Sequence, residues 1–178
     1  MVNETVVNSS VSEIADATIA RLIAAGLIPK LGKQKRDRVN WERMLAYEYV
    51  EKFYQDVPHW FRIEVGSLPP DKQDPIYTKT RRWAYCVIRM PDHLIVIEFK
   101  MQAQPGVISQ IEHYGQLIVE TPLFKKYWNE PVKIKIVCAM IDEKVHKLIE
   151  DRGIDVEIYK PSNFEQWYKQ VILKEKPV

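Results

Sequence analysis

The sequence is poor in the residues that mark several common classes of protein. It has two cysteines, Cys86 and Cys138, both in apolar stretches typical of strands. A disulfide scaffold is therefore not expected, and both should be reduced, buried thiols. The histidines show no metal-ligand spacing, which argues against zinc: His59, His93, His113 and His146. No apolar run indicates a signal peptide or membrane span, so we expect no membrane partner and a cytoplasmic protein, or one of the host cytoplasm if viral.

The chain also lacks a strong excess of charge of one sign. Its 178 residues carry a formal net charge of +2, so no global basic field indicates nucleic acid, and the length suits one domain with a sizeable core. Locally, residues 30–38 are rich in cations, and this segment is either a solvated linker or a loop that contacts phosphates. The basic residues of this segment and of a second cluster before a strand are Lys30, Lys33, Lys35, Arg36, Arg38, Arg81 and Arg82.

Two parts of the chain differ in character. Residues 1–39 read as a polar tail, a helix that opens at a Ser10 and Glu13 capping box, and the basic linker. Residues 40–178 carry the signals of a folded core. We therefore expect a domain boundary near residue 40. If the N-terminal tail is ordered, we expect it to contact a second copy of the chain or another assembly partner.

Helix and strand signals alternate through residues 40–178. Asn40 is a plausible N-cap, and Pro58 stops the helix that follows it. Val, Ile and aromatic residues mark the strands. In order, the sequence predicts a helix over 41–56, a strand over 60–65, a polar loop over 66–80, strands over 82–88 and 94–100, a helix over 107–119, a strand over 132–140, a helix over 142–152, an edge strand over 154–159 and a last helix from residue 162 or 163.

The two middle strands form a hairpin. Pro91 and Asp92 lie between the apolar runs, which is a turn signal. A turn there pairs residues whose numbers sum to 183. In a regular hairpin this places Tyr85 directly opposite Glu98 and on the same face.

The second strand ends in two opposite charges. Glu98 and Lys100 are two residues apart and share a face of a strand that is otherwise apolar. Buried charge is costly unless it is paired or holds a metal, so the pair is either an ion pair at an exposed strand end or part of a built site. Gln110 and Tyr114 share the inward side of the next helix, and they are either satisfied packing residues or members of that site.

Together these residues resemble a known family. A tight hairpin, a strand ending in Ile97-Glu98-Phe99-Lys100 and a Gln110-x-x-x-Tyr114 helix are similar to the PD-(D/E)xK nuclease superfamily, and in particular to its RecB-type branch. The resemblance covers roughly residues 40–160. It implies an α/β, restriction-endonuclease-like core of helix, three-stranded antiparallel meander, helix and further strand, here with an added N-terminal helix and C-terminal helices. The layout also looks like nuclease-like proteins of phages and mobile elements.

The resemblance also implies roles for the matched residues. Glu98 would bind one or two Mg²⁺ or Mn²⁺ ions, with the carbonyl of Phe99 as a further ligand. Lys100 would position the attacking water, and Gln110 and Tyr114 would orient the site or contact the nucleic-acid backbone. The implied partner is nucleic acid, in particular DNA.

A family helix often contributes one more carboxylate. At 100° per residue, Glu48 falls inside the apolar stripe of residues 41–53, whereas Glu42 and Glu51 fall on its flanks. Glu48 is therefore the candidate metal ligand, with an i,i+4 pair to Lys52 as the alternative.

The chain departs from the family at the metal-binding Asp of the preceding strand. The predicted register places Tyr85 there, and a phenol is a poor Mg²⁺ ligand. Asp92 belongs to the turn. Either another carboxylate rebuilds the site, with Glu48, Glu64 and Asp74 as candidates, or catalysis is weakened or lost.

Three functions follow from these alternatives. The first is a Mg²⁺-dependent DNA nuclease, weakened by the replaced Asp. The second is an inactive nuclease-fold protein that binds nucleic acid or forms part of a virus particle or other assembly. The third is a generic α/β binding domain with accidental motifs.

Overall fold

The computed structural model describes residues 40–67 and 82–175. The predicted tail, N-terminal helix and basic segment 30–38 lie outside the described residues, as do Asp74 and Arg81. In the described part, no helix has the length and apolar character needed to cross a bilayer.

The strands form one five-stranded sheet in the order β1-β2-β3-β4-β5. The first three make an antiparallel meander, and β4 and β5 continue the sheet in parallel. The strands are β1 (His59–Val65), β2 (Arg82–Arg89), β3 (Leu94–Ala103), β4 (Val132–Ile141) and β5 (Asp155–Ile158).

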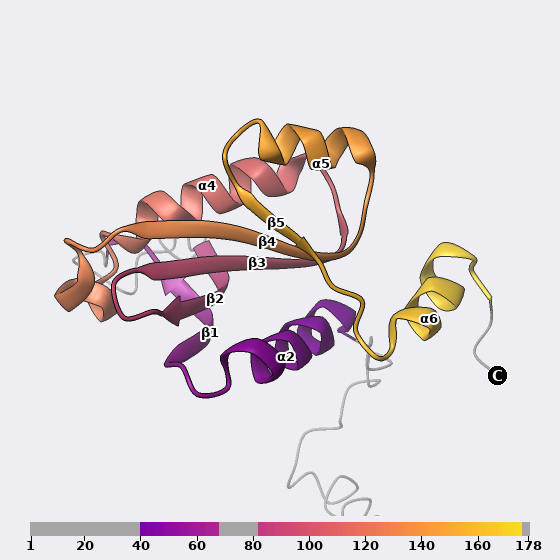
Figure 1. Cartoon of the computed structure of the whole chain (residues 1–178), viewed down its shortest axis with the longest axis horizontal. Coiled ribbons are helices and arrows are strands. Elements are labelled where there is room, and N and C mark those ends of the chain that lie inside the picture. Colours follow the sequence, from indigo (N-terminus) through magenta and orange to yellow (C-terminus); the bar gives the residue numbers. More distant parts are fainter. Residues whose placement is uncertain (1–39, 68–81, 176–178) are drawn as a thin grey trace, which may run out of the picture. The chain divides into compact units, whose positions relative to one another are not determined.

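Helices cover both faces of the sheet. Figure 1 shows α2 (Trp41–Tyr54) on one face and α4 (Gly106–Ile118) with α5 (Glu143–Glu150) on the other. The 3₁₀ helix η1 (Pro122–Tyr127), which the sequence did not predict, precedes β4. The chain ends in α6 (Phe164–Trp167) and a π-helical turn, η2 (Tyr168–Ile172), in place of the single predicted helix.

Local signals in the sequence explain where the helices begin. The side chain of Asn40 accepts a hydrogen bond of 3.0 Å from the backbone N–H of Arg43, which caps α2 as predicted. Asp142 caps α5 in the same way, through the N–H of Lys144. The predicted order of helix, antiparallel meander, helix and further strand is therefore confirmed, and with it the α/β fold class.

The sheet separates two hydrophobic cores. The α4-side core joins the sheet to α4, η1 and α5, and Ile111, Phe124 and Ile149 are buried in it. The α2-side core joins the other face to α2 and α6, and Tyr49 and Phe99 are buried in it. Cys86 and Cys138 are free and buried, as predicted.

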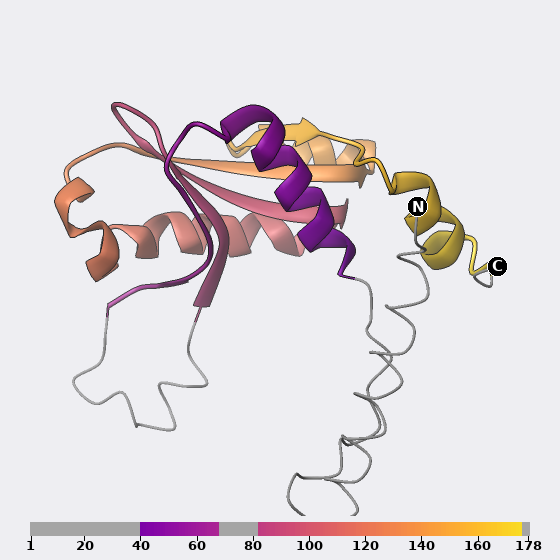
Figure 2. The ribbon, with the colours of Figure 1, turned by 90° about the horizontal axis from the view of Figure 1, so that it is seen from below.

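The β2–β3 hairpin has the predicted register, but its pairing is short. Cys86 pairs with Ile97 and Arg89 with Leu94, so the paired numbers sum to 183. The described pairing ends at Cys86, while β3 continues alone against β4 as far as Ala103. Figure 2 shows β1 and β2 running away from β3 and β4. The second half of β3 therefore lies at a fork in the sheet.

A backbone distortion interrupts the pairing of β1 with β2. Pairing runs to Phe61 opposite Cys86 and resumes at Ile63 opposite Ala84, so Arg62 and Tyr85 are skipped. Arg62 has a φ of 51°, a left-handed conformation that no regular strand contains. The paired numbers sum to 147 on both sides of the gap, so neither strand gains a residue, but the regular strand conformation is broken at Arg62.

The distortion corrects the prediction for Tyr85. Adjacent residues Tyr85 and Cys86 both pack into the α2-side core, whereas Ala84 lies in the α4-side core. The Tyr85 ring lies edge-on to Phe99, with centroids 5.5 Å apart. Glu98 instead contacts α4. The prediction that Tyr85 shares the face of Glu98 is therefore wrong, because strict alternation fails at the skipped residue.

Candidate functional site

The charged end of β3 is buried at the fork. Glu98 is 2% exposed, in a strand whose other central residues form core. Its Oε1 lies 2.9 Å from Nζ of Lys100, whose side chain is 24% exposed. The alternative of an ion pair at an exposed strand end is therefore excluded for Glu98, and Lys100 connects the buried carboxylate to the surface.

Helix α4 supplies two more predicted residues. Nε2 of Gln110 donates to Oε1 of Glu98 at 3.0 Å and to the hydroxyl of Tyr114 at 2.8 Å. The i,i+4 spacing that Gln-x-x-x-Tyr predicts thus places both side chains in one network with Glu98. The structure brings together Glu98, Lys100, Gln110 and Tyr114.

The carboxylate of Glu98 is held asymmetrically. Lys100 and Gln110 both bind Oε1, whereas Oε2 is buried and has no hydrogen-bond partner among the described residues. Buried polar atoms are rarely left unsatisfied unless an ion, a water or a catalytic role explains them. Oε2 of Glu98 could therefore accept a hydrogen bond from a water molecule or bind an ion.

The charges around Glu98 oppose one another. Burial raises the pKa of Glu98, the nearby charge of Lys100 lowers it, and the negative charge of Glu42 raises it again; the net shift is upward. The backbone N–H of Tyr85 is near enough to lower the same pKa slightly, although it forms no hydrogen bond with Oε2. Tyr85 thus turns its backbone toward Glu98 and its ring away.

The pKa of Lys100 is also raised. Burial alone would lower it, but the carboxylates of Glu98 and Glu42 together outweigh burial. Lys100 therefore stays a cation at neutral pH, as its predicted role requires.

The first turn of α2 contributes a carboxylate that the sequence did not single out. Glu42 affects the pKa of Glu98, Lys100 and Tyr85, so its charge lies near all three. The sequence placed Glu42 on the flank of the helix. Glu42 is therefore the α2 carboxylate whose charge acts on Glu98 and Lys100.

Glu48 serves a different purpose. Its carboxylate accepts hydrogen bonds from the hydroxyl of Tyr159, at 2.9 Å, and from the N–H and hydroxyl of Ser162, at 3.0 and 2.7 Å. The prediction that Glu48 joins Glu98 is wrong, because the apolar stripe of α2 faces the chain after β5 at that point. Glu48 ties α2 to the C-terminal segment.

We expect Glu48→Ala to lower the free energy of unfolding by about 1–2 kcal/mol, since it removes charged hydrogen bonds from a partly exposed site. Burial alone would raise the pKa of Glu48, but the hydrogen bonds from Ser162 and Tyr159 hold it below its usual 4.5. A lowered folded-state pKa stabilises above the unfolded value, and that stability is lost as pH falls through the folded value. Urea denaturation should therefore show a penalty at pH 7 that shrinks below about pH 4.5. A penalty that persists in acid would contradict this.

The described residues fit a divalent ion only in part. No group of three His, Cys, Asp or Glu side chains that could hold a metal occurs among them. Mg²⁺, however, is usually bound through one or two carboxylates and keeps several waters. The open Oε2 of Glu98, with Glu42 nearby, meets that smaller requirement.

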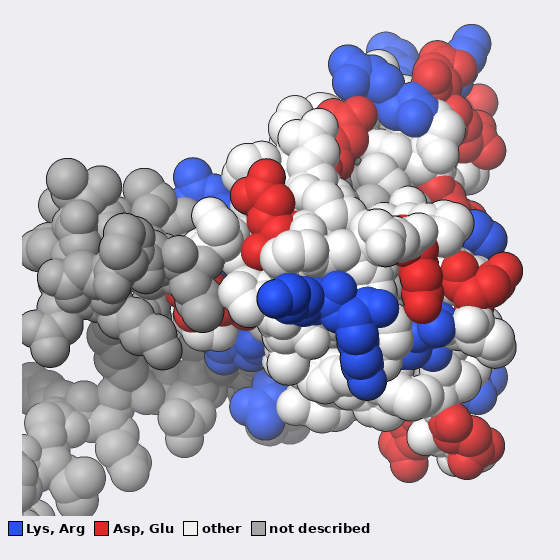
Figure 3. Space-filling view, turned by 90° about the vertical axis from the view of Figure 1, so that its left-hand side faces the viewer, with Lys and Arg blue, Asp and Glu red and all other residues white. Residues whose placement is uncertain are grey.

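The other predicted site residues, Phe99 and Arg82, lie in different surroundings. Phe99 is buried between the rings of Tyr49 and Tyr85, so its side chain is core, and metal binding by its carbonyl stays a prediction. Arg82 is exposed at the start of β2. Figure 3 shows one face of the molecule, on which Lys and Arg side chains lie among Asp and Glu and many uncharged residues. On that face, the described residues form no surface of one sign.

Comparison with known proteins gives limited similarity. No family model matches the sequence, and no curated protein matches it. Two solved structures are similar in part. A complex of EndoMS with double-stranded DNA shares 17% identity over 67% of this chain and 44% of that chain, with a TM-score of 0.40. A repair endonuclease from Pyrococcus abyssi shares 15% identity over 70% of this chain and 49% of that one, also with a TM-score of 0.40. The chain spans less than half the length of each.

Proposed function

We propose that this protein is a metal-dependent nuclease that acts on DNA, with its reacting centre at Glu98. The observation that carries the proposal is the buried Glu98 carboxylate, which has one oxygen bound by Lys100 and Gln110 and the other open. Buried polar atoms usually have a hydrogen-bond partner, and among the described residues Glu98 is the one carboxylate that belongs to the buried core. The resemblance to the PD-(D/E)xK superfamily supplies the reaction class.

Each residue of the site has a role in this proposal. Glu98 and Glu42 would hold a Mg²⁺ or Mn²⁺ ion, which when bound neutralises charge on the phosphate and makes water more acidic. Lys100 holds a positive charge beside the carboxylate, where it can orient a water molecule. Gln110 fixes the rotation of the Glu98 carboxylate, and its bond to Tyr114 fixes Gln110 in turn. Gln110 and Tyr114 are therefore positioning residues.

The test is cleavage of labelled single-stranded and double-stranded DNA by the full chain in Mg²⁺ or Mn²⁺. We expect cleavage that EDTA abolishes. Because Glu42 adds negative charge near Glu98, Glu42→Gln should raise the metal concentration needed for half-maximal cleavage by about tenfold, the lower end of the loss caused by removing a supporting residue.

Glu51→Gln is the matched control, since Glu51 is an exposed carboxylate at the other end of α2. It should leave the metal requirement unchanged. An equal effect of both substitutions would mean that general surface charge, not a site at the fork, sets the metal requirement.

A second candidate is an inactive nuclease-fold protein that binds nucleic acid or forms part of an assembly. The lack of any group of three or more His, Cys, Asp or Glu side chains that could hold a metal among the described residues favours it. No cleavage with either metal, combined with DNA binding that needs no metal, would support this candidate against the nuclease.

A further inference from the structure

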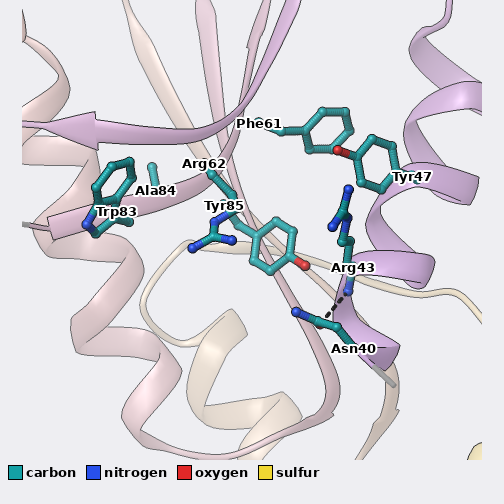
Figure 4. A pocket seen from close by; sticks show the side chains of 8 residues that line it. All are labelled: Asn40, Arg43, Tyr47, Phe61, Arg62, Trp83, Ala84 and Tyr85. Carbon is teal, nitrogen blue, oxygen red and sulfur yellow. Dashed lines mark hydrogen bonds between the residues drawn. The ribbon is translucent and has the colours of Figure 1, made fainter. Parts of the chain in front are cut away.

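A pocket of about 360 Å³ lies on the α2 side of the sheet, next to the fork. Figure 4 shows its walls: Asn40, Arg43 and Tyr47 come from α2 and its cap, and the side chains across from them come from β1 and β2. The volume falls within the range of small-molecule sites. Most of the lining residues lie outside the Glu98 network, and together they are Asn40, Arg43, Tyr47, Phe61, Arg62, Trp83, Ala84 and Tyr85.

The charge of the pocket suits an anion. Arg43 and Arg62 both line it, and no Asp or Glu does among the described residues. Within the described part of the chain, neither guanidinium forms an ion pair. Arg43 instead lies over the ring of Tyr47, 5.3 Å from its centroid. Two guanidinium groups that no described carboxylate neutralises favour the binding of a phosphate group, which Arg binds through paired hydrogen bonds.

The aromatic residues of the pocket suit a planar ring. Trp83 is 46% exposed and Tyr47 is 45% exposed, although both are large. The ring of Tyr47 packs against that of Phe61 at a tilt, with centroids 4.4 Å apart. The ring of Trp83, by contrast, contacts no other aromatic ring among the described residues. An exposed indole beside a basic group is the arrangement on which nucleic-acid bases stack.

The backbone conformation of Arg62 is unfavourable, which suggests that it is kept for a function. Its φ of 51° is unusual for a residue other than glycine and costs of order 1–3 kcal/mol. Residues held in such a conformation are found more often at functional sites than elsewhere. Here the distortion directs both Arg62 and Tyr85 into the pocket, as Figure 4 shows.

Tyr85 connects the pocket to the fork. Burial raises its pKa most, the charges of Glu42 and Glu98 raise it further, and those of Arg62 and Arg43 lower it. The phenol is therefore within electrostatic reach of both carboxylates and both guanidinium groups.

We propose that this pocket binds one unpaired nucleotide of a nucleic-acid strand, with the base against Trp83 and a phosphate between Arg43 and Arg62. The inference rests on the proposed function and names its substrate class, a single-stranded segment or unpaired end. A paired base cannot enter such a pocket, because both its faces are stacked within the duplex.

The test measures binding of a fluorescent eight-nucleotide oligothymidylate to the full chain by anisotropy, in EDTA so that no cleavage occurs. Arg43→Ala should reduce the slope of log K against log salt by about 0.7, the value for one phosphate contact on a single strand. Lys52→Ala is the matched control. Lys52 is an exposed cation on the same helix and also lies over an aromatic ring, that of Phe53, and its loss should leave the slope unchanged.

Variants of Trp83 test whether a base of the oligonucleotide stacks on its indole ring. Trp83→Ala should weaken oligothymidylate binding by about 5- to 150-fold, the range for losing one base stack, and Trp83→Phe should restore most of it. The unfolding midpoint of each variant is measured alongside. If Trp83→Ala does not fold, Trp83→Phe and Arg43→Ala still decide the question.

The outcomes separate this inference from the nuclease proposal. Weaker binding by Arg43→Ala but not Lys52→Ala supports the pocket, even if the protein cleaves nothing. Native cleavage with unchanged oligothymidylate binding in both arginine and tryptophan variants overturns the pocket while leaving the nuclease intact. Binding of thymidine monophosphate as tight as that of the oligonucleotide, or preference for a blunt duplex, also overturns it, since the site would then take a free nucleotide or paired DNA.

Discussion

Glu98→Gln is expected to reduce metal-dependent DNA cleavage by about a thousandfold or more. The substitution keeps the shape of the side chain and removes its negative charge. Under the proposed function, a divalent cation would lose its main ligand, and the charge stabilisation that the metal would supply would be lost with it. The amide oxygen of the introduced glutamine can still accept a hydrogen bond from Lys100 or Gln110. The folded structure should therefore persist, and circular dichroism and the urea midpoint should confirm it.

The chain offers a matched control for this variant. Glu157 pairs with Lys135 at 2.8 Å, much as Glu98 pairs with Lys100 at 2.9 Å. Glu157→Gln removes the same charge from a similar ion pair on β5, away from the fork. Cleavage should remain within about twofold of the native rate, since surface substitutions away from a site have small effects. Equal losses in the two variants would mean that the charge of the protein, rather than the site, limits cleavage.

The sequence predicted those parts of the site that depend on local pattern. Pro91 and Asp92 set the hairpin register, and that register is confirmed up to Cys86. The four-residue spacing of Gln110 and Tyr114 placed both on the inner side of α4. Such predictions hold because a turn or a helical repeat is decided by residues close in sequence.

The wrong predictions arose where distant parts of the chain decide the outcome. Tyr85 was placed by strict alternation, which fails because Arg62, on another strand, adopts a left-handed backbone. No residue preference indicated this, since arginine has no special tendency toward that conformation. The same distortion forms the Arg62 wall of the pocket, so the pocket could not be predicted either.

The choice between Glu42 and Glu48 has a similar cause. Helical periodicity shows which side of α2 is apolar, but not which end of the helix approaches the fork. Glu48 lies on the apolar side and meets Ser162, more than a hundred residues later in the sequence. Glu42 lies in the first turn of α2, and its charge acts on Glu98 and Lys100. Which turn of α2 does so depends on how the helix packs on the sheet, which is not a local property of the sequence.

Lys100→Met should produce a large and pH-dependent loss of stability. It leaves the Glu98 carboxylate, whose side chain is 3% exposed, without its cation. Removing one partner of a buried pair costs more than the pair itself contributes. Because Lys100 is partly exposed, we expect a loss of about 2–4 kcal/mol at pH 7, measured by urea denaturation.

The pH dependence follows from the raised pKa of Glu98. Lys100 lowers that pKa in the native protein, so its removal raises it further. When the folded-state pKa of a carboxyl lies above its unfolded value, the folded state binds more protons, and stability rises as pH falls from the folded value toward the unfolded one. The penalty of Lys100→Met should therefore shrink between pH 7 and about pH 4.5.

The double variant Glu98→Gln with Lys100→Met decides whether the buried charge is the cause. It removes both charges, so most of the loss should be recovered at pH 7 and its dependence on pH should disappear, giving a coupling energy of about 2 kcal/mol in a double-mutant cycle. Lys135→Met is the control, because its partners Asp155 and Glu157 are 66% and 36% exposed and should tolerate the loss with a smaller penalty. If Lys100→Met costs no more than Lys135→Met and the double variant recovers nothing, then water reaches Glu98 freely. In that case the open oxygen of Glu98 would be a solvated atom and would no longer indicate a metal site.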